Sequence, residues 1–268
     1  MPNQMNPHEE MWRGLLTDPE SPLHSDRKKF KFLPGSPRCK TCLFPLGGPL
    51  VRTLSKKWGR EPSRMNPNFC NLCEEFVRTH PGGAEIDVSL IFADVRGSTT
   101  MAEQMSPADF TALMNRFFKA GSQVLIDNDA LLDKFVGDEV VGLYLPALVA
   151  EHPRAAIKTA LDLLRATGHA DPEDPWLPVG IGVHCGTAFV GSVGDGSVAD
   201  FTAMGDVVNI TARLASEAAG GELLVTEEAW ARGGVGDRAA EERNLELKGR
   251  SASINVRVLR LDSEGPDS

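Results

Sequence analysis

Two aspartates stand where the sequence predicts a divalent cation. Asp94 follows an apolar run at residues 88–93 that is typical of a buried β-strand, and Asp138 lies at a turn within residues 130–144, which predict a β-hairpin. If these strands are neighbours, the two carboxylates lie close together, and a cation between them removes their repulsion. Paired metal ions commonly serve displacements at phosphorus. The pattern therefore predicts chemistry on a metal-bound nucleoside triphosphate.

Further polar residues follow the aspartates in a pattern that suits a phosphorylated substrate. Asn209 and Arg213 are four residues apart in a predicted helix at residues 205–219, so they lie on one helix face. Asparagine offers hydrogen bonds, and arginine offers a planar fork for a phosphate or a developing phosphorane. Lys134 precedes Asp138 by four residues on the same predicted strand. Each residue alone is commonly a cap or a surface ion pair, whereas their combination favours a site.

Four of the five cysteines form two CxxC pairs, with 27 residues between the pairs. Each pair can place two thiolates on one ion, and two such pairs complete a tetrahedral site. The four predicted ligands are Cys39, Cys42, Cys70 and Cys73. Structural zinc is our first interpretation, an iron–sulfur cluster is the alternative, and labile disulfides acting as a redox sensor are a third reading.

Charge and breaker residues divide the chain into parts. Residues 1–83 carry 13 lysines and arginines against 8 acidic residues, and the remainder carries 15 against 29. We expect a mostly irregular N-terminal segment at 1–37 with one short helix around His8–Leu16, a zinc-ribbon-like module at 38–83, a main domain at 84–262 and a tail at 263–268. The sequence predicts no membrane segment and no signal peptide, hence a cytoplasmic protein. A net charge of −9 makes nucleic acid an unfavourable partner.

The main domain alternates between strand and helix patterns, which predicts an α+β fold. We expect a ferredoxin-like mixed sheet with helices packed on it. Within it, residues 177–186 predict a strand with 187–193 as its hairpin partner, and residues 245–249 and 253–259 predict a terminal strand pair.

Four motifs, in order, resemble the class III nucleotidyl cyclases. They are FADVRGST at residues 92–99, KFVGD at 134–138, GIGVHCG at 180–186 and MGDVVNITAR at 204–213. The likeness covers residues 85–261, about two thirds of the chain, and the four-cysteine module is not part of the general family pattern. It implies the class III cyclase fold and the conversion of ATP into 3′,5′-cyclic AMP and pyrophosphate.

The resemblance also implies a role for each matching residue. Asp94 and Asp138, with the Val95 carbonyl, match ligands of two Mg²⁺ or Mn²⁺ ions, and Asn209 and Arg213 match the pair that orients the ribose and stabilises the transition state. The remaining matches are Lys134 and Thr202, which read the purine and go with adenine, and Lys248, which contacts the triphosphate. The family's site forms between two chains, which implies a homodimer with two equivalent sites.

Several alternatives stay open at this point. The Lys134/Thr202 pairing resembles the subgroup that contains bicarbonate-responsive cyclases, so bicarbonate is a candidate signal, as is an unidentified regulatory partner. The substrate could be another nucleotide. Gly137-Asp138-Glu139 is faintly similar to the turn motif of diguanylate cyclases but lacks its first glycine and its phenylalanine. A regulatory or nucleic-acid-binding zinc protein with a degenerate cyclase domain is a further alternative. Cys185 is expected to be a buried apolar thiol.

Overall fold

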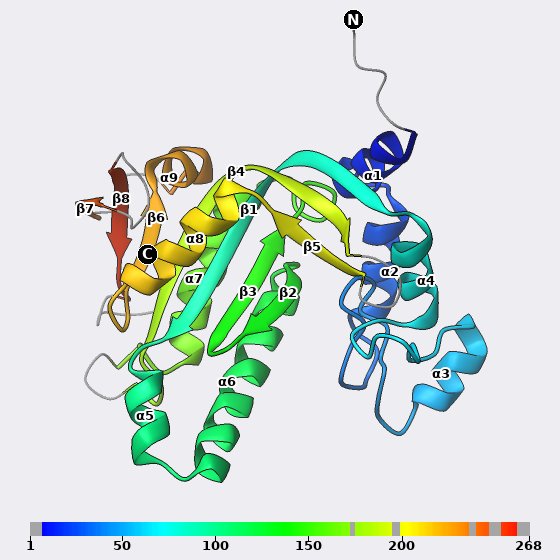
Figure 1. Ribbon diagram of the computed structural model, residues 1–268, viewed down its shortest axis with the longest axis horizontal. Coiled ribbons are helices and arrows are strands. Elements are labelled where there is room, and N and C mark those ends of the chain that lie inside the picture. Colours follow the sequence, from blue (N-terminus) through cyan, green and yellow to red (C-terminus); the bar gives the residue numbers. More distant parts are fainter. Residues whose placement is uncertain (1–6, 172–174, 195–198, 236–239, 247–252, 262–268) are drawn as a thin grey trace, which may run out of the picture. The chain divides into compact units, whose positions relative to one another are not determined.

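The computed structural model describes residues 7–171, 175–194, 199–235, 240–246 and 253–261 (Figure 1). Its helices are α1 (Pro7–Thr17), α2 (Pro22–Phe30), α3 (Val51–Trp58), α4 (Asn71–Thr79), α5 (Ser98–Gln104), α6 (Pro107–Asp127), α7 (His152–Ala166), α8 (Asp206–Glu217) and α9 (Glu227–Gly233). Its strands are β1 (Gly82–Val95), β2 (Leu131–Val136), β3 (Glu139–Tyr144), β4 (Val179–Val193), β5 (Asp200–Met204), β6 (Leu223–Thr226), β7 (Glu241–Leu245) and β8 (Ile254–Leu259). These strands form one mixed sheet in the order β2-β3-β1-β4-β6-β8-β7, with β5 paired to β4. The expected mixed α+β sheet is confirmed.

The chain forms two compact units. Unit 1 comprises residues 1–87, 145–150 and 187–204, and unit 2 comprises residues 88–144, 151–186 and 205–268. Strands β1 and β4 each contribute to both units, because the unit boundaries fall inside them. No helix in the described part of the chain is long and apolar enough to cross a membrane.

The hairpin that carries Asp138 forms where the sequence predicts it. Strands β2 and β3 pair antiparallel, with Val136 opposite Glu139, so Gly137 and Asp138 form a two-residue loop. Gly137 has a φ of +60°. A two-residue hairpin with glycine at its first central position matches the twist of the flanking strands, because glycine adopts positive φ without steric cost. Local sequence thus fixes the tip on which Asp138 stands.

Strand β4 differs from the prediction. We expected a strand at residues 177–186 followed by a hairpin partner at 187–193, whereas the structure has one strand, β4, that pairs with β5. The prediction of a turn was wrong, because β4 continues through residues 186 and 187 and its antiparallel partner is β5 (Asp200–Met204). Within unit 1, a Cβ on Gly191 would stand 2.3 Å from the Gly82 carbonyl oxygen. Glycine at Gly191 therefore permits a close backbone approach inside a strand and does not end it.

Other boundaries also differ from the sequence-based expectation. Residues 1–37 contain two helices where we expected mostly irregular chain, because Pro7 and Pro22 occupy first-turn positions and start helices. Ser21 caps α2 by accepting from the His24 N–H. The first strand of the terminal pair, β7, begins at Glu241 and ends at Leu245. Helix α9, which the sequence pattern did not reveal, is capped by Thr226.

Two glycines in β4 decide how closely α8 lies against the sheet in unit 2. A Cβ on Gly182 would stand 2.6 Å from both the Thr211 carbonyl oxygen and the Ala215 nitrogen. A Cβ on Gly180 would stand 2.5 Å from the Ala218 carbonyl oxygen. Any side chain at either glycine would force helix and strand apart. The GIG sequence therefore lets the buried face of α8 pack backbone to backbone on β4.

Candidate active site and four-cysteine site

The two predicted metal-binding aspartates lie together in unit 2. Asp94 is near the carboxyl end of β1, directly opposite Glu139 of β3 in the antiparallel register, and Asp138 precedes Glu139 at the hairpin tip. The Asp138 carboxyl group is close enough to hydrogen-bond Asp94. Neighbouring strands thus bring these three carboxyl groups to one place, as the sequence predicted for the first two. Glu139 is the member of the group that sequence reasoning missed, although it directly follows Asp138.

Crowding in this group opposes ionisation. Burial raises the pKa of Glu139 to about 7, and the charges of Asp94 and Asp138 add to the effect. Burial also raises the pKa of Asp94, where the neighbouring Asp138 again adds and Arg96 partly compensates. Carboxylates that repel one another in a half-buried site are stabilised by a divalent cation with oxygen ligands. The donor set and its electrostatics therefore fit an ion such as Mg²⁺ or Mn²⁺.

Arg96 contacts this acidic group from the turn after β1. Its guanidinium forms an ion pair with Asp94 and donates a hydrogen bond to the Ser216 carbonyl oxygen at 2.6 Å. The backbone N–H of Arg96 donates to the Pro178 carbonyl oxygen at 2.9 Å. This residue was quoted only as part of a motif at the sequence level. The structure shows that it ties the turn after Asp94 to the end of α8 and to the start of β4.

Asn209 and Arg213 lie one turn apart on α8, as their spacing predicts. Residues Val207, Ile210, Thr211, Leu214 and Ala215 form the buried face of this helix. Asn209 is exposed and Arg213 is half-buried. Neither side chain is joined to another described residue by a hydrogen bond or an ion pair. The helix therefore presents an amide and a guanidinium that are available to a ligand.

The remaining predicted site residues are distributed over both units. Lys134 belongs to unit 2, where it follows a β-bulge in β2 and its ammonium lies 3.6 Å from an Asp133 carboxylate oxygen. Thr202 belongs to unit 1, where it is buried in β5 opposite Gly191 of β4. Val95 is the buried last residue of β1. Lys248 lies outside the described residues.

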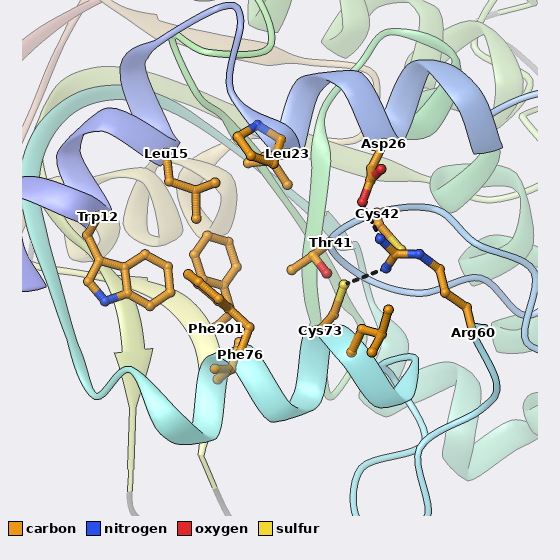
Figure 2. A pocket seen from close by; sticks show the side chains of 13 residues that line it. Trp12, Leu15, Leu23, Asp26, Thr41, Cys42, Arg60, Cys73, Phe76 and Phe201 are labelled. Carbon is orange, nitrogen blue, oxygen red and sulfur yellow. Dashed lines mark hydrogen bonds and ion pairs between the residues drawn. The ribbon is translucent and has the colours of Figure 1, made fainter. Parts of the chain in front are cut away.

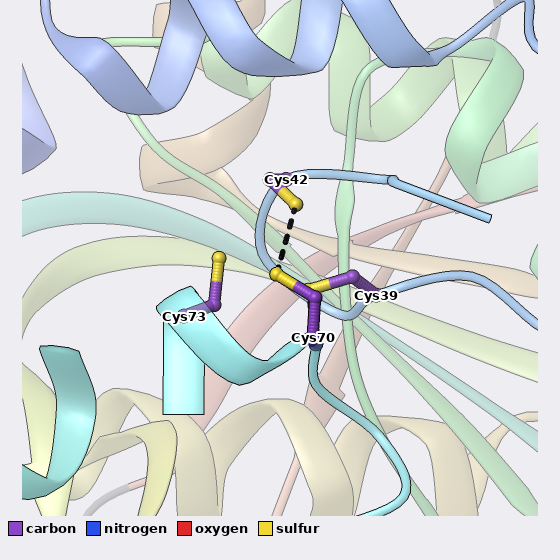
Figure 3. A group of neighbouring side chains, drawn as sticks. All are labelled: Cys39, Cys42, Cys70 and Cys73. Carbon is purple, nitrogen blue, oxygen red and sulfur yellow. Dashed lines mark hydrogen bonds between the residues drawn. The ribbon is translucent and has the colours of Figure 1, made fainter. Parts of the chain in front are cut away.

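The four cysteines of the two CxxC pairs converge in unit 1 (Figure 3). Their sulfur atoms all lie within 4.8 Å of one another, and the Cys42 and Cys70 sulfurs are 3.8 Å apart. No disulfide joins any of the five cysteines, all of which lie among the described residues. Four sulfurs around one ion at a zinc–sulfur distance of about 2.3 Å would stand roughly 3.8 Å apart. The cluster therefore has the spacing of a site for a single tetrahedral ion.

Hydrogen bonds and one cation surround the sulfur atoms of this cluster. The Cys70 backbone N–H donates to the Cys39 sulfur at 3.3 Å. Burial alone would raise the pKa of Cys39, but hydrogen bonds from the other three cysteines lower it well below its usual value, and hydrogen bonds with Cys39 in turn raise the pKa values of Cys42 and Cys73. Arg60 donates from Nη1 to the sulfurs of Cys42, Cys70 and Cys73 at 3.4–3.6 Å. A positive charge beside the sulfurs favours their ionised form. The sequence gave no signal for Arg60, which lies in the loop between the CxxC pairs.

A cavity of about 340 Å³ adjoins the four-cysteine cluster in unit 1 (Figure 2). Its polar end is formed by Cys42, Cys73 and the Arg60–Asp26 ion pair. Figure 2 shows Trp12, Phe76 and Phe201 gathered away from Arg60. The Trp12 ring stacks on Phe201 with centroids 5.8 Å apart and meets Phe76 edge-on at 5.2 Å. Helices α1 and α4 and strand β5 therefore share one aromatic cluster.

Comparison with known proteins supports the class of fold and site. The sequence model of the adenylate and guanylate cyclase catalytic domain matches residues 84–259. An adenylate cyclase of Anabaena cylindrica is 30% identical over 147 residues, which are 52% of this chain and 29% of that protein. Adenylate cyclase 1 of Rhizobium meliloti (strain 1021) is 34% identical over 134 residues, 48% of this chain and 20% of that protein. The chain thus spans less than a third of the length of either relative.

A solved structure shows the same fold. The crystal structure of the guanylyl cyclase Cya2 superposes with a TM-score of 0.60 at 22% identity, over 66% of this chain and 93% of that chain. At this identity the likeness establishes the mixed α+β fold of a class III cyclase. With the family model matching most of the chain, and with its motifs at Asp94, Asp138, Asn209 and Arg213, this protein belongs to the adenylate and guanylate cyclase catalytic domain family.

Proposed function

We propose that this protein is an adenylate cyclase, which converts ATP into 3′,5′-cyclic AMP and pyrophosphate. The observation that carries the proposal is the close approach of Asp94 and Asp138 within a cyclase-family domain. Two relatives named as adenylate cyclases support ATP as the substrate. In the reaction, the ribose 3′-oxygen forms a bond to the α-phosphorus, the bond from that phosphorus to the β-phosphate oxygen breaks, and the hydroxyl proton passes to solvent.

The protein's own groups bind and orient the substrate. Asp94 and Asp138, with the Val95 carbonyl, hold two Mg²⁺ or Mn²⁺ ions. When bound, these ions lower the pKa of the 3′-hydroxyl and neutralise charge on the triphosphate, so no protein base is required. Asn209 orients the ribose by hydrogen bonding. Arg213 offers its planar fork to the charge that develops on the α-phosphate oxygens.

Lys134 and Thr202 are proposed to read the purine. Adenine N1 accepts a hydrogen bond, which a lysine ammonium can donate, whereas guanine N1–H needs an acceptor such as glutamate. Lys248 is proposed to contact the triphosphate. Because the family's site lies between two chains, we propose a homodimer in which Asp94 and Asp138 of one chain face Lys134, Thr202, Asn209 and Arg213 of the other. One chain carries all of these residues, so two equivalent sites follow from two-fold symmetry.

The four-cysteine cluster is proposed to hold one zinc ion. Its sulfur spacing supports a single tetrahedral ion over a [4Fe–4S] cluster, because that cluster attaches its thiolates to four different iron atoms and so holds them farther apart. Its buried position and complete set of four thiolates favour a structural role.

Nucleotide turnover tests the proposal. Purified protein with Mn²⁺ is offered ATP, GTP, CTP or UTP separately, and the products are identified by mass spectrometry. We expect cyclic AMP and pyrophosphate from ATP at a rate far above that of any other cyclic product. Cyclic GMP as the main product would overturn the assignment of adenine as the base. The absence of a cyclic product from every nucleotide would contradict the proposal that the protein is a cyclase. Adding bicarbonate at constant pH tests that signal in the same assay.

A further inference from the structure

Within unit 1, the first cysteine pair is tied to strand β5 by a buried ion pair. Lys40 lies between Cys39 and Cys42, and its ammonium stands 3.1 Å from each carboxylate oxygen of Asp200, the first residue of β5. The Lys40 side chain is only 6% exposed. An ammonium group this buried is stable as a cation only when anionic or polar partners replace its water. The Asp200 side chain is 39% exposed, so the buried partner of this pair is Lys40. The contact links two segments that are 160 residues apart in the sequence.

The Lys40 end of this contact is rigidly held. The Lys40 backbone N–H donates to the Asn68 carbonyl oxygen at 2.8 Å, and the Cys39 sulfur accepts from the Cys70 backbone N–H. Hydrogen bonds at Cys39 and at Lys40 itself thus connect the first cysteine pair to the segment that carries Cys70. With a metal ion on the four sulfurs, this turn would have no freedom to move relative to the second pair.

The Asp200 end leads directly to Thr202. Side chains alternate along a strand, so Asp200 and Thr202 lie on one face of β5, and Phe201 between them lies on the other. The Asp200 carboxylate also accepts from the Phe201 backbone N–H at 2.9 Å. On the other face, the Phe201 ring stacks on Trp12. Both faces of β5 next to Thr202 are thus held by residues of the N-terminal part of unit 1.

We propose that Lys40 is a positioning residue for the purine contact of the cyclase. Through Asp200 it fixes the start of β5, and thereby the place of the Thr202 hydroxyl. The inference rests on the proposed role of Thr202 in reading the purine. It gives the four-cysteine module a function in substrate selection, because the turn that carries two of the cysteines also carries Lys40. The effect falls on recognition of the base and not on the chemistry at phosphorus, which other residues perform.

The test compares three variants of the full-length protein. Lys40→Met keeps the length of the side chain and removes its charge, Asp200→Asn removes the partner's charge without touching the cysteine pairs, and Lys56→Met is a matched control on an exposed face of α3. We expect Lys40→Met and Asp200→Asn each to raise the KM for ATP about five- to tenfold, the loss expected when a misplaced Thr202 hydroxyl no longer makes one neutral hydrogen bond to the base, with kcat changed less than about twofold. Their preference for ATP over GTP should fall by a similar factor, and the double variant should be no worse than either single variant. Lys56→Met should match the wild type.

Two further measurements distinguish this proposal from loss of the zinc ion and from failure of the proposed role of Thr202. Zinc content should stay at the wild-type level in Lys40→Met and Asp200→Asn, and hydrogen exchange of a peptide over residues 199–204 should be faster in both. The inference would be overturned if hydrogen exchange at residues 199–204 were unchanged in Lys40→Met and Asp200→Asn. It would also be overturned if these two variants kept the wild-type KM and base preference while Thr202→Ala changed the base preference. If Thr202→Ala also leaves the base preference unchanged, the proposed role of Thr202 fails, and the exchange data alone decide whether Lys40 orders β5. If Lys40→Met loses its zinc, the proposal is judged on Asp200→Asn alone, because that substitution does not touch the cysteine pairs.

Discussion

Two clusters in this protein bring together side chains that repel one another when ionised. One is the acidic cluster of Asp94, Asp138 and Glu139, and the other is the four-cysteine cluster. The carboxylates stand at a strand end and a two-residue hairpin and are half-buried, and burial raises the pKa values of Asp94 and Glu139. The cysteines supply four soft ligands to one enclosed point, with Arg60 beside them. An incomplete, accessible set of hard ligands suits an ion that arrives with a substrate, whereas a complete set of thiolates suits a permanent ion. The difference assigns chemistry to one cluster and folding energy to the other.

The largest expected effect separates the two clusters by activity. Asp94→Asn removes a charge from the proposed metal site, so we expect cyclic AMP formation to fall by at least about a thousandfold, because an ion that stabilises the transition state is lost. Thermal unfolding and zinc content should stay near the wild-type values. The matched control is Glu103→Gln, an exposed acidic residue on α5, which should retain full activity. Substantial activity in Asp94→Asn would contradict the proposed site.

The same variant tests whether the site is shared between chains. An equal mixture of Asp94→Asn and Arg213→Ala chains, allowed to exchange, should form mixed dimers in which one of two sites is intact. Since about half of the dimers are mixed, activity should recover to about one quarter of the wild-type value. No recovery after confirmed exchange would argue for sites built within one chain.

The next effect separates the clusters by stability. Cys70→Ser removes one of four thiolates, so we expect zinc to fall from one ion per chain to none and the unfolding temperature to drop by about 10 °C or more, because bound metal is folding energy in small cysteine-rich modules. Cys185→Ser is the matched control, since Cys185 is buried in unit 2, as expected from the sequence, and contacts Arg232. Elemental analysis and calorimetry check both variants. Iron with acid-labile sulfide in the wild type would replace zinc with the iron–sulfur alternative.

The smallest expected effect concerns a buried carboxylate that the protein neutralises with its own cations. Arg243 contacts Glu222 through two hydrogen bonds of 3.0 Å and, with the Ala219 N–H and Arg260, lowers the pKa of Glu222 to about 2. A lowered pKa stabilises the fold above the unfolded-state pKa, near 4.5, and this contribution is lost as the pH falls toward 2.

Glu222→Gln should therefore lower the free energy of unfolding by about 3 kcal/mol at pH 7, and by progressively less below pH 4.5. Denaturant titrations at several pH values check this, with Glu103→Gln as the control. A chelator should leave this stability difference unchanged, whereas it should affect the properties that depend on the acidic cluster and the four-cysteine cluster. A pH-independent difference would mean that packing, and not charge, accounts for the loss.

Local patterns in the sequence were sufficient for much of the fold and for the identity of the ligands. The alternation at residues 130–144 predicted the hairpin under Asp138, and Ser106-Pro107 marks the start of α6, where the Ser106 side chain accepts from the Asp109 N–H. The spacing of Asn209 and Arg213 placed both on one face of α8, and two CxxC pairs predicted one four-sulfur cluster. These features depend on contacts between residues close in sequence, or on residue types that have few other uses. They can therefore be predicted without the tertiary structure.

Only the tertiary structure decided the rest, because it depends on which distant segments approach each other. The sequence predicted a turn between residues 186 and 187, whereas β4 continues to Val193, and Gly191 in its second half lies against the Gly82 backbone. Glu139 directly follows Asp138 but faces Asp94 only through the strand register, and Arg96 meets Ser216, 120 residues away, only through the fold. The Lys40–Asp200 pair spans 160 residues, and no spacing rule connects an isolated lysine to an isolated aspartate at that distance. Sequence therefore determined what chemistry this protein carries, and the fold decided which residues support it.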